Sequence, residues 1–116
     1  MKNSSTIFHK IISGEIPAQI IFEDEQVVAF KDINPVAPSH VLIVPRKTIP
    51  SLKEVTGDHK MLLGHMLVVA GEIAKKLGLE EHGYRVVINS GEKAGQSVFQ
   101  LHFHLMGGRE FSWPPG

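Results

Sequence analysis

The stretch that decides the fold is QSVFQLHFHLMGG, Gln96 to Gly108, near the C-terminal end of the chain. Apolar and polar residues alternate strictly through its centre. The apolar set is Phe99, Leu101, Phe103 and Leu105, and the polar set is Gln100, His102 and His104. A period of two is typical of a β-strand, so the stretch predicts a strand over residues 97–106 with one polar face. That face carries two histidines, and the strand then stops at two glycines.

The rest of the chain predicts the element order α-β-β-β-α-β-β. A short helix is expected over 5–15, with Ser4 or Ser5 as its cap and Gly14 as its stop. A long helix is expected from Asp58, as its cap, to Leu77, because apolar residues recur there at helical spacing. The expected strands are 18–24, 26–33, 40–45, 84–90 and 97–106. Strands before and after one long helix favour an α+β fold, an antiparallel five-stranded sheet with its helices on one side.

The composition excludes several classes of function. The length of 116 residues favours a single domain over 1–116. A formal net charge of zero and a pI of about 7.1 give no basic field to attract nucleic acid or an anionic membrane. There is no cysteine, which excludes disulfides and thiolate metal sites. The N-terminal residues contain no apolar run long enough for a signal peptide or a spanning helix, so we expect a cytoplasmic protein.

His102 and His104 lie two residues apart on the predicted strand, so they point the same way at a separation of about 6.6 Å. Such a pair could give two imidazoles to a metal ion, which would need a third ligand such as His40 or a carboxylate. It could also perform covalent catalysis, in which one imidazole attacks and its neighbour holds or protonates the substrate. The third possibility is a solvated strand face with two half-exposed histidines. The spacing alone leaves all three open.

Other candidate residues have equally ordinary structural interpretations. The glycine-containing loop SGEKAGQS, residues 90–97, could bring backbone N–H groups close to an anion, although it lacks the P-loop spacing. Asn89 could add a neutral donor from the side, and Asp32 could either cap a turn or accept hydrogen bonds from two vicinal hydroxyls, as on ribose. One apolar set could be core or could wall a purine pocket: Ile7, Phe8, Ile11 and Phe30.

Taken together, these residues resemble a known family. QSVFQLHFHLMGGR is similar to the histidine-triad motif of the HIT superfamily, His-φ-His-φ-His-φ-φ, where φ is apolar. Residues 7–47, 83–97 and 107–116 resemble the Hint branch of that superfamily, so the resemblance covers nearly the whole chain. One departure is clear, because Gln100 stands where the first histidine of the triad belongs.

The resemblance implies a fold, a partner and an activity. Members are similar homodimers in which each subunit gives five antiparallel strands to one sheet that continues across the interface. They bind purine nucleotides such as AMP or GMP, and they hydrolyse the P–N bond of nucleoside phosphoramidates such as AMP joined to an amine. Some also hydrolyse aminoacyl-adenylates. The chemistry requires no metal and no cofactor.

The resemblance also implies roles for individual positions. His102 corresponds to the nucleophile, His104 to the last triad histidine beside the phosphate, and His40 to a further active-site histidine. Asp32 matches the ribose-binding acid, with Ile33 next to it. The phosphate-contacting positions are Asn89, Gly95, Gln96 and Ser97, with backbone N–H groups of 95–97 expected to stabilise the phosphate oxygens. The nucleotide pocket would include Ile7, Phe8, Ile11, Phe30 and Leu42, and Trp113 would reach the partner subunit's site.

Gln100 leaves two hypotheses open. If residue 100 contributes mainly a backbone carbonyl that orients the His102 imidazole, glutamine is tolerated and the chain is a phosphoramidase working through a nucleotidyl-histidine. If its side chain belongs to a proton relay with His40, glutamine slows turnover because it does not titrate near neutral pH. The alternative is then a nucleotide-binding or scaffold protein with impaired catalysis. Since Gln100 is expected on the His102 face, Gln100→His is predicted to raise kcat by about tenfold or less.

Overall fold

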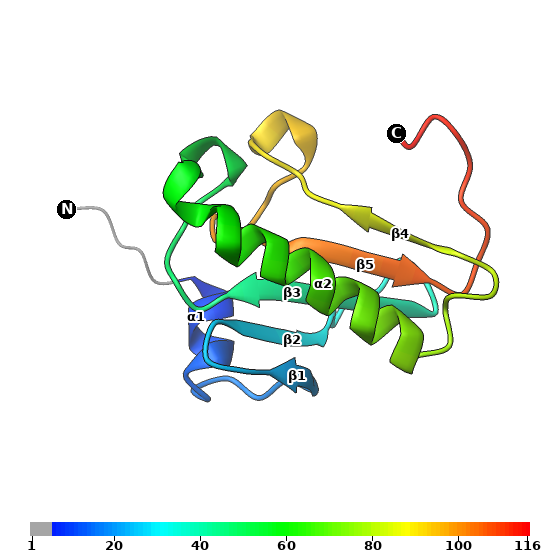
Figure 1. Cartoon of the computed structure of the whole chain (residues 1–116), viewed down its shortest axis with the longest axis horizontal. Coiled ribbons are helices and arrows are strands. Elements are labelled where there is room, and N and C mark those ends of the chain that lie inside the picture. Colours follow the sequence, from blue (N-terminus) through cyan, green and yellow to red (C-terminus); the bar gives the residue numbers. More distant parts are fainter. Residues whose placement is uncertain (1–5) are drawn as a thin grey trace.

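The computed structural model describes residues 6–116, and its centre is an antiparallel sheet of five strands (Figure 1). In chain order the strands are β1 (Ile20–Glu23), β2 (Val27–Lys31), β3 (Ser39–Pro45), β4 (Tyr84–Val87) and β5 (Phe103–Gly107). Their order across the sheet is β1-β2-β3-β5-β4, so the last strand inserts between β3 and β4. Helix α1 (Ile7–Ile12) precedes β1, and helix α2 (Lys60–Lys76) connects β3 to β4. The predicted α+β class and the predicted order of elements are confirmed.

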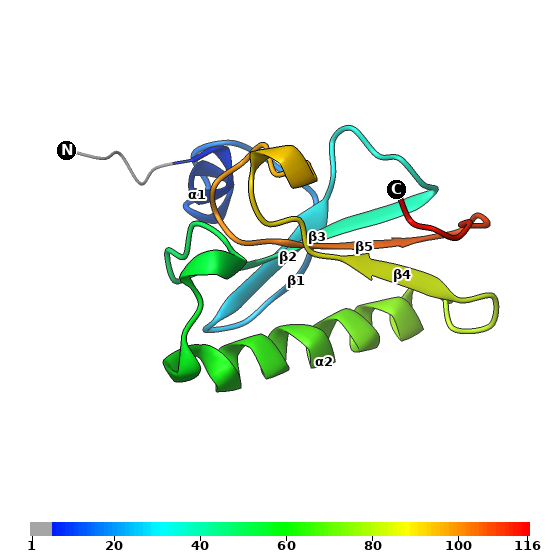
Figure 2. The same ribbon diagram turned by 90° about the horizontal axis from the view of Figure 1, so that it is seen from above.

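The central strands β2 and β3 are buried on both faces, because each face packs against a different layer. One set of alternating side chains joins the large core beneath α2: Val27, Ala29, Val41 and Ile43. The intervening set joins a smaller core with Phe8 of α1: Val28, Phe30, Leu42 and Val44. Figure 2 shows α1 and α2 on opposite sides of the sheet. The prediction that both helices lie on one side is therefore wrong, since the continuous apolar run of β2 leaves no face for water.

Helix α2 covers its face of the sheet with the predicted apolar stripe. The buried members of the stripe are Leu62, Met66, Val69 and Ile73, and Leu77 is half-buried. The helix begins two residues later than predicted. Asp58 lies instead in a 3-10 turn, η2 (Gly57–His59), where its own N–H donates to Thr56 Oγ1 at 3.3 Å. Asp58 is thus capped rather than capping, whereas Gly78, with a φ of +73°, ends the helix as predicted.

Helix α1 is short and begins with a reciprocal cap. Thr6 Oγ1 accepts the N–H of His9 at 3.3 Å, while His9 Nδ1 accepts the N–H of Thr6 at 2.9 Å. The expected caps Ser4 and Ser5 lie outside the described residues, and Thr6 occupies the capping position. Gly14 follows the helix with a φ of +84°, so the predicted stop is confirmed.

Strand β5 is shorter than the alternation of its sequence predicts. Ladder pairing with β3 and β4 covers only residues 103–107, and residues 96–102 are irregular. The facing strand explains the early end, because β3 finishes at Pro45, and a proline has no N–H to extend the ladder. Phe99, expected on the apolar face, is 47% exposed, while Leu101 is buried. Hydrogen bonds to residues 45–50 hold the irregular segment in place of a ladder.

The two glycines that end β5 are required by close packing. A Cβ at Gly107 would lie 2.8 Å from both Cδ atoms of Leu79, which packs beneath the sheet. Gly108 has a φ of +92°, and a Cβ there would lie 2.9 Å from Pro38. The loop after β2 and the chain after α2 therefore approach the end of β5 so closely that a side chain at position 107 or 108 would collide with them.

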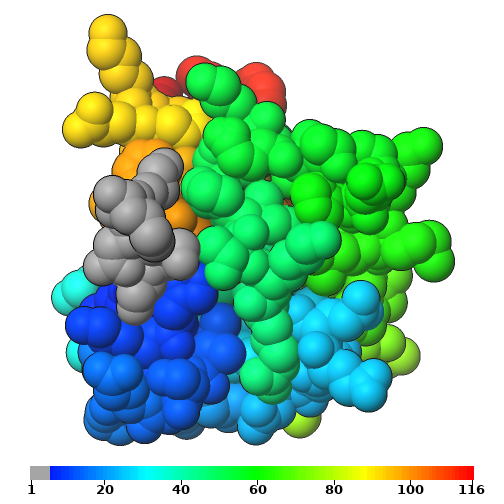
Figure 3. Space-filling model, turned by 90° about the vertical axis from the view of Figure 1, so that its left-hand side faces the viewer, coloured from blue at the N-terminus to red at the C-terminus, as the bar shows by residue number. Residues whose placement is uncertain are grey.

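The loop after β3, the helix α1 and the 3-10 turn η3 (Glu92–Ala94) meet at one end of the molecule (Figure 3). Figure 2 places α1, the loop between β2 and β3, and the loop containing η3 on the face of the sheet opposite α2. In residues 6–116, no helix combines the length and the apolar character needed to cross a membrane.

Candidate functional site

His40 and His104 lie side by side on neighbouring strands. In the β3–β5 register His40 is opposite Met106 and Leu42 is opposite His104, so the two histidines are diagonal neighbours on one face. His40 Nε2 lies 2.9 Å from His104 Nδ1, and the ring centroids are 5.2 Å apart. The sheet thus joins a residue early in the chain to the second histidine of the H-x-H pair.

Hydrogen bonds assign the tautomers of this pair. His40 Nδ1 accepts the backbone N–H of Val36 at 3.1 Å, so neutral His40 carries its proton on Nε2. That Nε2–H donates to His104 Nδ1, which must then be unprotonated. The remaining proton of His104 is on Nε2. His104 therefore presents a hydrogen-bond donor, rather than a lone pair, on the ring nitrogen that faces away from His40.

His102 has the opposite arrangement. Its Nδ1 lies 2.7 Å from the backbone carbonyl of Gln100, and because a carbonyl can only accept, Nδ1 carries the proton. The unprotonated Nε2 keeps its lone pair. The ring is 6% exposed, it meets the edge of the Phe8 ring at a centroid distance of 4.8 Å, and its centroid is 5.0 Å from that of His104. The two adjacent imidazoles thus differ in what they present: His102 presents a lone pair on Nε2, and His104 presents a hydrogen-bond donor on Nε2.

Asp32 joins the same cluster through the β2–β3 hairpin. Its N–H donates to the carbonyl of His40 at 2.9 Å, which places its side chain beside the His40 ring. Oδ1 accepts the N–H of Asn34 at 2.9 Å, and Oδ2 lies 3.4 Å from His40 Nε2. The side chain is 19% exposed, and the neighbouring Ile33 is 88% exposed. Asp32 therefore forms a turn, as its ordinary interpretation predicts, and still presents acceptor oxygens at the edge of the cluster.

Burial lowers the pKa of all three histidines. For His40 and His102 burial is the largest cause of the lowered pKa; the charge of Asp32 opposes it at both, as does the Gln100 carbonyl at His102. Burial, followed by repulsion from protonated His102 and His40, lowers the pKa of His104 to about 4. All three rings are therefore neutral near neutral pH. The contact of His40 with Asp32 is accordingly a polar contact of a neutral ring and not an ion pair.

The glycine-containing loop is more self-contained than predicted. The N–H of Gly95 donates to Glu92 and that of Gln96 donates to Gly91, each at 3.0 Å, so neither is free for a phosphate. The prediction that backbone N–H groups of 95–97 all serve the anion is wrong for these two. Ser97 remains, since it is exposed and makes no hydrogen bond within the part of the chain that the structure describes.

The side chain of Gln96 is structural. It is 3% exposed; its Oε1 accepts the N–H of Gly91 at 2.9 Å, and its Nε2 donates to the carbonyls of Pro50 and Val98. Asn89 lies against Gly95, where an added Cβ would be 3.7 Å from its Nδ2. Asn89 is half-buried, so its side-chain amide can reach a ligand, whereas the buried amide of Gln96 cannot.

The apolar residues expected to wall a nucleotide pocket divide into two groups. Phe8, Phe30 and Leu42 are 7%, 2% and 4% exposed and form the small core under α1. Ile11 packs half-buried against that core, and Ile7 is 49% exposed. In the first group, Phe8 packs against the His102 ring. Among the apolar candidates, only Ile7, Ile11 and Ile33 offer apolar surface to a base.

Gln100 does not share a polar face with His102 and His40. Its side chain is fully buried and hydrogen-bonds to backbone groups of residues 45–49, away from the histidine cluster. The prediction that the Gln100 side chain shares a strand face with His102 is therefore wrong, because residue 100 precedes β5 and the period of two no longer sets its direction. Of the two alternatives left open by the sequence, the relay with His40 has no contact to support it. The expected backbone role is confirmed by the Gln100 carbonyl on His102.

The donor atoms that could meet a metal ion include only one histidine of the H-x-H pair. Asp32, His40 and His104 each offer one donor, and within residues 6–116 these three atoms lie within 4.8 Å of one another. Within the same residues, His102 belongs to no such group. The shortest of these contacts already serves as the hydrogen bond between His40 and His104.

Sequence reasoning missed how the C-terminal segment supports the cluster. Arg109 Nε donates to the carbonyl of Val36 at 2.9 Å, and the N–H of Val36 is the group that fixes His40. The guanidinium groups of Arg85 and Arg109 lie 5.1 and 4.3 Å from the centroid of the Phe111 ring. The only signal of this support in the sequence is that Arg109, Phe111 and Trp113 alternate with polar residues in the tail. Trp113 beyond it is 83% exposed.

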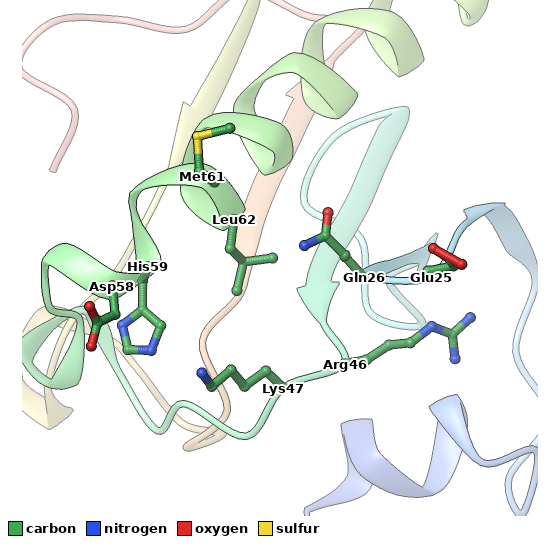
Figure 4. A pocket seen from close by; sticks show the side chains of 8 residues that line it. All are labelled: Glu25, Gln26, Arg46, Lys47, Asp58, His59, Met61 and Leu62. Atoms are coloured by element: carbon green, nitrogen blue, oxygen red, sulfur yellow. The ribbon is translucent and has the colours of Figure 1, made fainter.

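A separate hollow of about 270 Å³ lies away from the histidines, between the β1–β2 turn, the end of β3 and the start of α2 (Figure 4). Its lining mixes acidic and basic side chains: Glu25, Arg46, Lys47, Asp58 and His59. None of the candidate catalytic residues borders it.

Comparison with known proteins agrees with this geometry. The family model described as the HIT domain matches residues 13–111. An uncharacterised HIT-like protein of Synechocystis is 54% identical over 111 residues, which cover 96% of each chain. A 14 kDa zinc-binding protein of Zea mays is 50% identical over 118 residues, which cover 100% of this chain and 91% of that protein.

Solved structures show the same fold. A HIT family hydrolase from Legionella pneumophila superposes with a TM-score of 0.94 at 46% identity, covering 97% of this chain and 100% of the other. A histidine triad nucleotide-binding protein from Candida albicans superposes with a TM-score of 0.80 at 37% identity, covering 95% and 83%.

Proposed function

Because this chain belongs to the HIT domain family, we propose that it hydrolyses the P–N bond of purine nucleoside 5′-phosphoramidates, such as AMP joined to an amine. The single domain spans residues 1–116, and no metal or other cofactor takes part. The fold is that of HIT family hydrolases and nucleotide-binding proteins. The substrate class goes beyond those descriptions and depends on the chemistry of the site.

The observation that carries the proposal is the hydrogen bond from His102 Nδ1 to the Gln100 carbonyl at 2.7 Å. It leaves Nε2 unprotonated on a ring whose pKa is lowered by burial, so the neutral nucleophile predominates near neutral pH. After attack the ring becomes positively charged. The carbonyl that fixes the tautomer also stabilises this charge, since it accepts a hydrogen bond from the remaining Nδ1–H.

The reaction proceeds in two displacements at phosphorus. His102 Nε2 attacks the α-phosphorus, the Nε2–P bond forms and the P–N bond breaks, and the amine departs. The proton for the departing amine comes from Ser97, which is exposed and makes no hydrogen bond within residues 6–116, or from the substrate itself. Water then attacks the nucleotidyl-histidine, the Nε2–P bond breaks, and AMP is released; the proton of this water returns to Ser97 where Ser97 supplied the first proton, and otherwise leaves with AMP. His104, neutral at a pKa of about 4, binds a non-bridging oxygen through its Nε2–H.

Nucleotide recognition follows from the groups around this centre. Asp32 accepts hydrogen bonds from the ribose hydroxyls with its partly exposed carboxylate. Ile33 and Ile7, which are 88% and 49% exposed, cover the faces of the purine. Burying these two apolar side chains against a base makes a favourable contribution to the free energy of binding, because both are exposed to water in the free protein.

An AMP–amine substrate whose released amine fluoresces tests the proposal directly. We expect turnover that is unchanged after extended chelation, together with accumulation of AMP. A protein that binds AMP but releases no amine would instead support the second candidate, a nucleotide-binding protein with impaired catalysis. Turnover lost with a chelator and restored by zinc would assign Asp32, His40 and His104 to a metal, in keeping with the donor positions.

We also propose that the protein is a homodimer whose sheet continues across β4. This strand is an edge of the sheet, and β5 is its only partner within residues 6–116. Beside it, α2 presents an i, i+3, i+4, i+7 stripe of small and apolar residues: Gly64, Leu67, Val68 and Gly71. Leu67 and Val68 are 53% and 57% exposed, and Tyr84 of β4 is 40% exposed. An unpaired edge next to an apolar stripe is what a second copy would cover.

A further inference from the structure

The side chain of Gln100 is bonded at every polar atom. Oε1 accepts the N–H of Ile49 at 3.1 Å, and Nε2 donates to the carbonyls of Pro45 at 2.9 Å and Lys47 at 2.8 Å. Both N–H groups of the carboxamide are thus hydrogen-bonded, and the residue is completely buried. The residue in the position of the first triad histidine thus makes three hydrogen bonds to the segment 45–49.

These bonds fix a segment that no ladder holds. Between η3 and β5 the chain is irregular, and its other backbone connection at this level is the N–H of Leu101 donating to Ile49 at 2.7 Å. On the other side of the connection, the side chains of Arg46 and Lys47 border the hollow of Figure 4. The 45–47 segment is held by other contacts: Pro45 pairs with Val27 of β2, and Arg46 donates from its N–H to the carbonyl of Gln26 and from Nε to that of Asp24, each at 2.8 Å. Gln100 therefore ties the irregular segment 96–102 to a part of the chain that its own hydrogen bonds already fix.

The same residue orients the nucleophile. The carbonyl of Gln100 lies 2.7 Å from His102 Nδ1. We propose that Gln100 is a positioning residue, whose side chain anchors its own peptide group so that the carbonyl holds His102 with Nε2 unprotonated. This inference rests on the proposed function for its effect on rate, but its effect on the His102 tautomer does not depend on any substrate.

No other side chain satisfies the same three partners. A neutral histidine has one donor and one acceptor, so it leaves at least one of the two carbonyls unpaired. Glutamate would place a second acceptor against those carbonyls. Methionine matches the length of glutamine but bonds none of the three, which leaves the buried N–H of Ile49 without a partner. Substitution by histidine should therefore slow the enzyme, which reverses the expectation drawn from the triad motif.

The test compares Gln100→Met and Gln100→His with Gln26→Met, a control at an exposed glutamine. Ring ¹⁵N NMR of His102 reports the tautomer, and steady-state kinetics with the AMP–amine substrate report kcat and KM. In both Gln100 variants we expect the single Nδ1–H tautomer to become a mixture and kcat to fall by about tenfold or more, with KM within about threefold. Gln26→Met should match the wild type in both measurements.

Exchange of the Gln100 carboxamide protons with solvent gives a measurement on the unaltered protein, should a variant fail to fold. We expect these protons to exchange as slowly as the backbone amides of β5, because they are buried and bonded. Rapid exchange, a folded Gln100→Met that keeps the single tautomer, or a Gln100→His that exceeds the wild-type kcat would each overturn the positioning role. Absence of turnover in the wild type with the NMR results as expected would contradict the proposed function alone.

Discussion

A single hydrogen bond at His102 decides which ring nitrogen can react. The Gln100 carbonyl accepts a hydrogen bond from Nδ1–H, and the bare Nε2 is the atom that the proposed mechanism uses as its nucleophile. Two residues along, His104 Nδ1 accepts a hydrogen bond from His40 Nε2–H, so His104 presents its own Nε2–H instead. Identical side chains on one face of the sheet thus acquire different chemistry from their partners alone.

Replacing His102 by alanine should abolish turnover and leave AMP affinity within about tenfold, because ribose, base and phosphate contacts remain. Calorimetric titration with AMP and the amine-release assay measure the two effects. His82→Ala, at an exposed histidine, is the matched control and should retain full activity. A quench without acid should show AMP attached to His102, and a label on any other residue would refute its role.

Asp32 should make binding depend on the ribose hydroxyls. A bound nucleotide covers the Asp32 carboxylate, and an analogue without these hydroxyls leaves its acceptor atoms unpaired, so 2′,3′-dideoxy-AMP should bind more weakly than AMP. In Asp32→Ala the two ligands should bind equally. Titration of both proteins with both ligands completes a double-difference cycle. Equal affinities in the wild type would remove Asp32 from the ribose site.

The lowered pKa of His102 predicts an acid-tolerant enzyme. Protonation of Nε2 blocks attack, so kcat/KM should fall as pH decreases through the pKa of His102 in the free enzyme. Burial places that pKa below its ordinary value of 6.5. The midpoint of this decline should therefore lie below pH 6.5. A midpoint at or above 6.5 in the pH profile would contradict this assignment.

At the scale of elements, the end of β5 is fixed by backbone conformation and by contact with a neighbouring loop. Gly14 and Gly108 both have positive φ angles, but only Gly108 also lies against another residue, Pro38. Alanine at Gly14 should cost about 1–2 kcal/mol of the free energy of unfolding from φ alone. Alanine at Gly108 should cost clearly more, because the same φ is combined with a contact at 2.9 Å. Urea unfolding of both variants compares them, and equal losses would show that Pro38 yields without cost.

At the scale of the whole molecule, the uncovered edge at β4 predicts the oligomeric state. The wild type should sediment at about twice the 12.8 kDa chain mass at micromolar concentration. Val68→Glu, which places a charge on the stripe of α2 beside β4, should sediment as a monomer. Ile20→Glu is the control, since Ile20 is 41% exposed on β1, the opposite edge of the sheet. A monomeric wild type would contradict the proposed dimer.

The sequence by itself determined the elements and the chemistry available to them. Period-two alternation in HFHL, the continuous apolar run of β2 and the helical stripe of α2 each depend on neighbours along the chain. Strand β2 and helix α2 formed to within about two residues of their predicted bounds, whereas β5 kept its predicted end to within one residue but began six residues late. The site residues could likewise be named, because histidines, an acid and a glycine loop stand in a specific order. The helix starts depended on more than the local pattern: Thr6 caps α1, and a 3-10 turn capped by Thr56 takes in Asp58, so that α2 begins after His59.

Only the tertiary structure decided how these residues are used. That α1 lies opposite α2 follows from apolar residues on both faces of β2 and β3, which need two covering layers. Gln100 turns away from His40 for two reasons. Pro45 ends the ladder on the neighbouring strand β3, and backbone groups of residues 45–49 form hydrogen bonds with the Gln100 side chain. The tautomers of His40, His102 and His104 depend on Val36 and Gln100 in the same way. Contacts between residues distant in the chain set direction and protonation, and no local pattern of residue types encodes them.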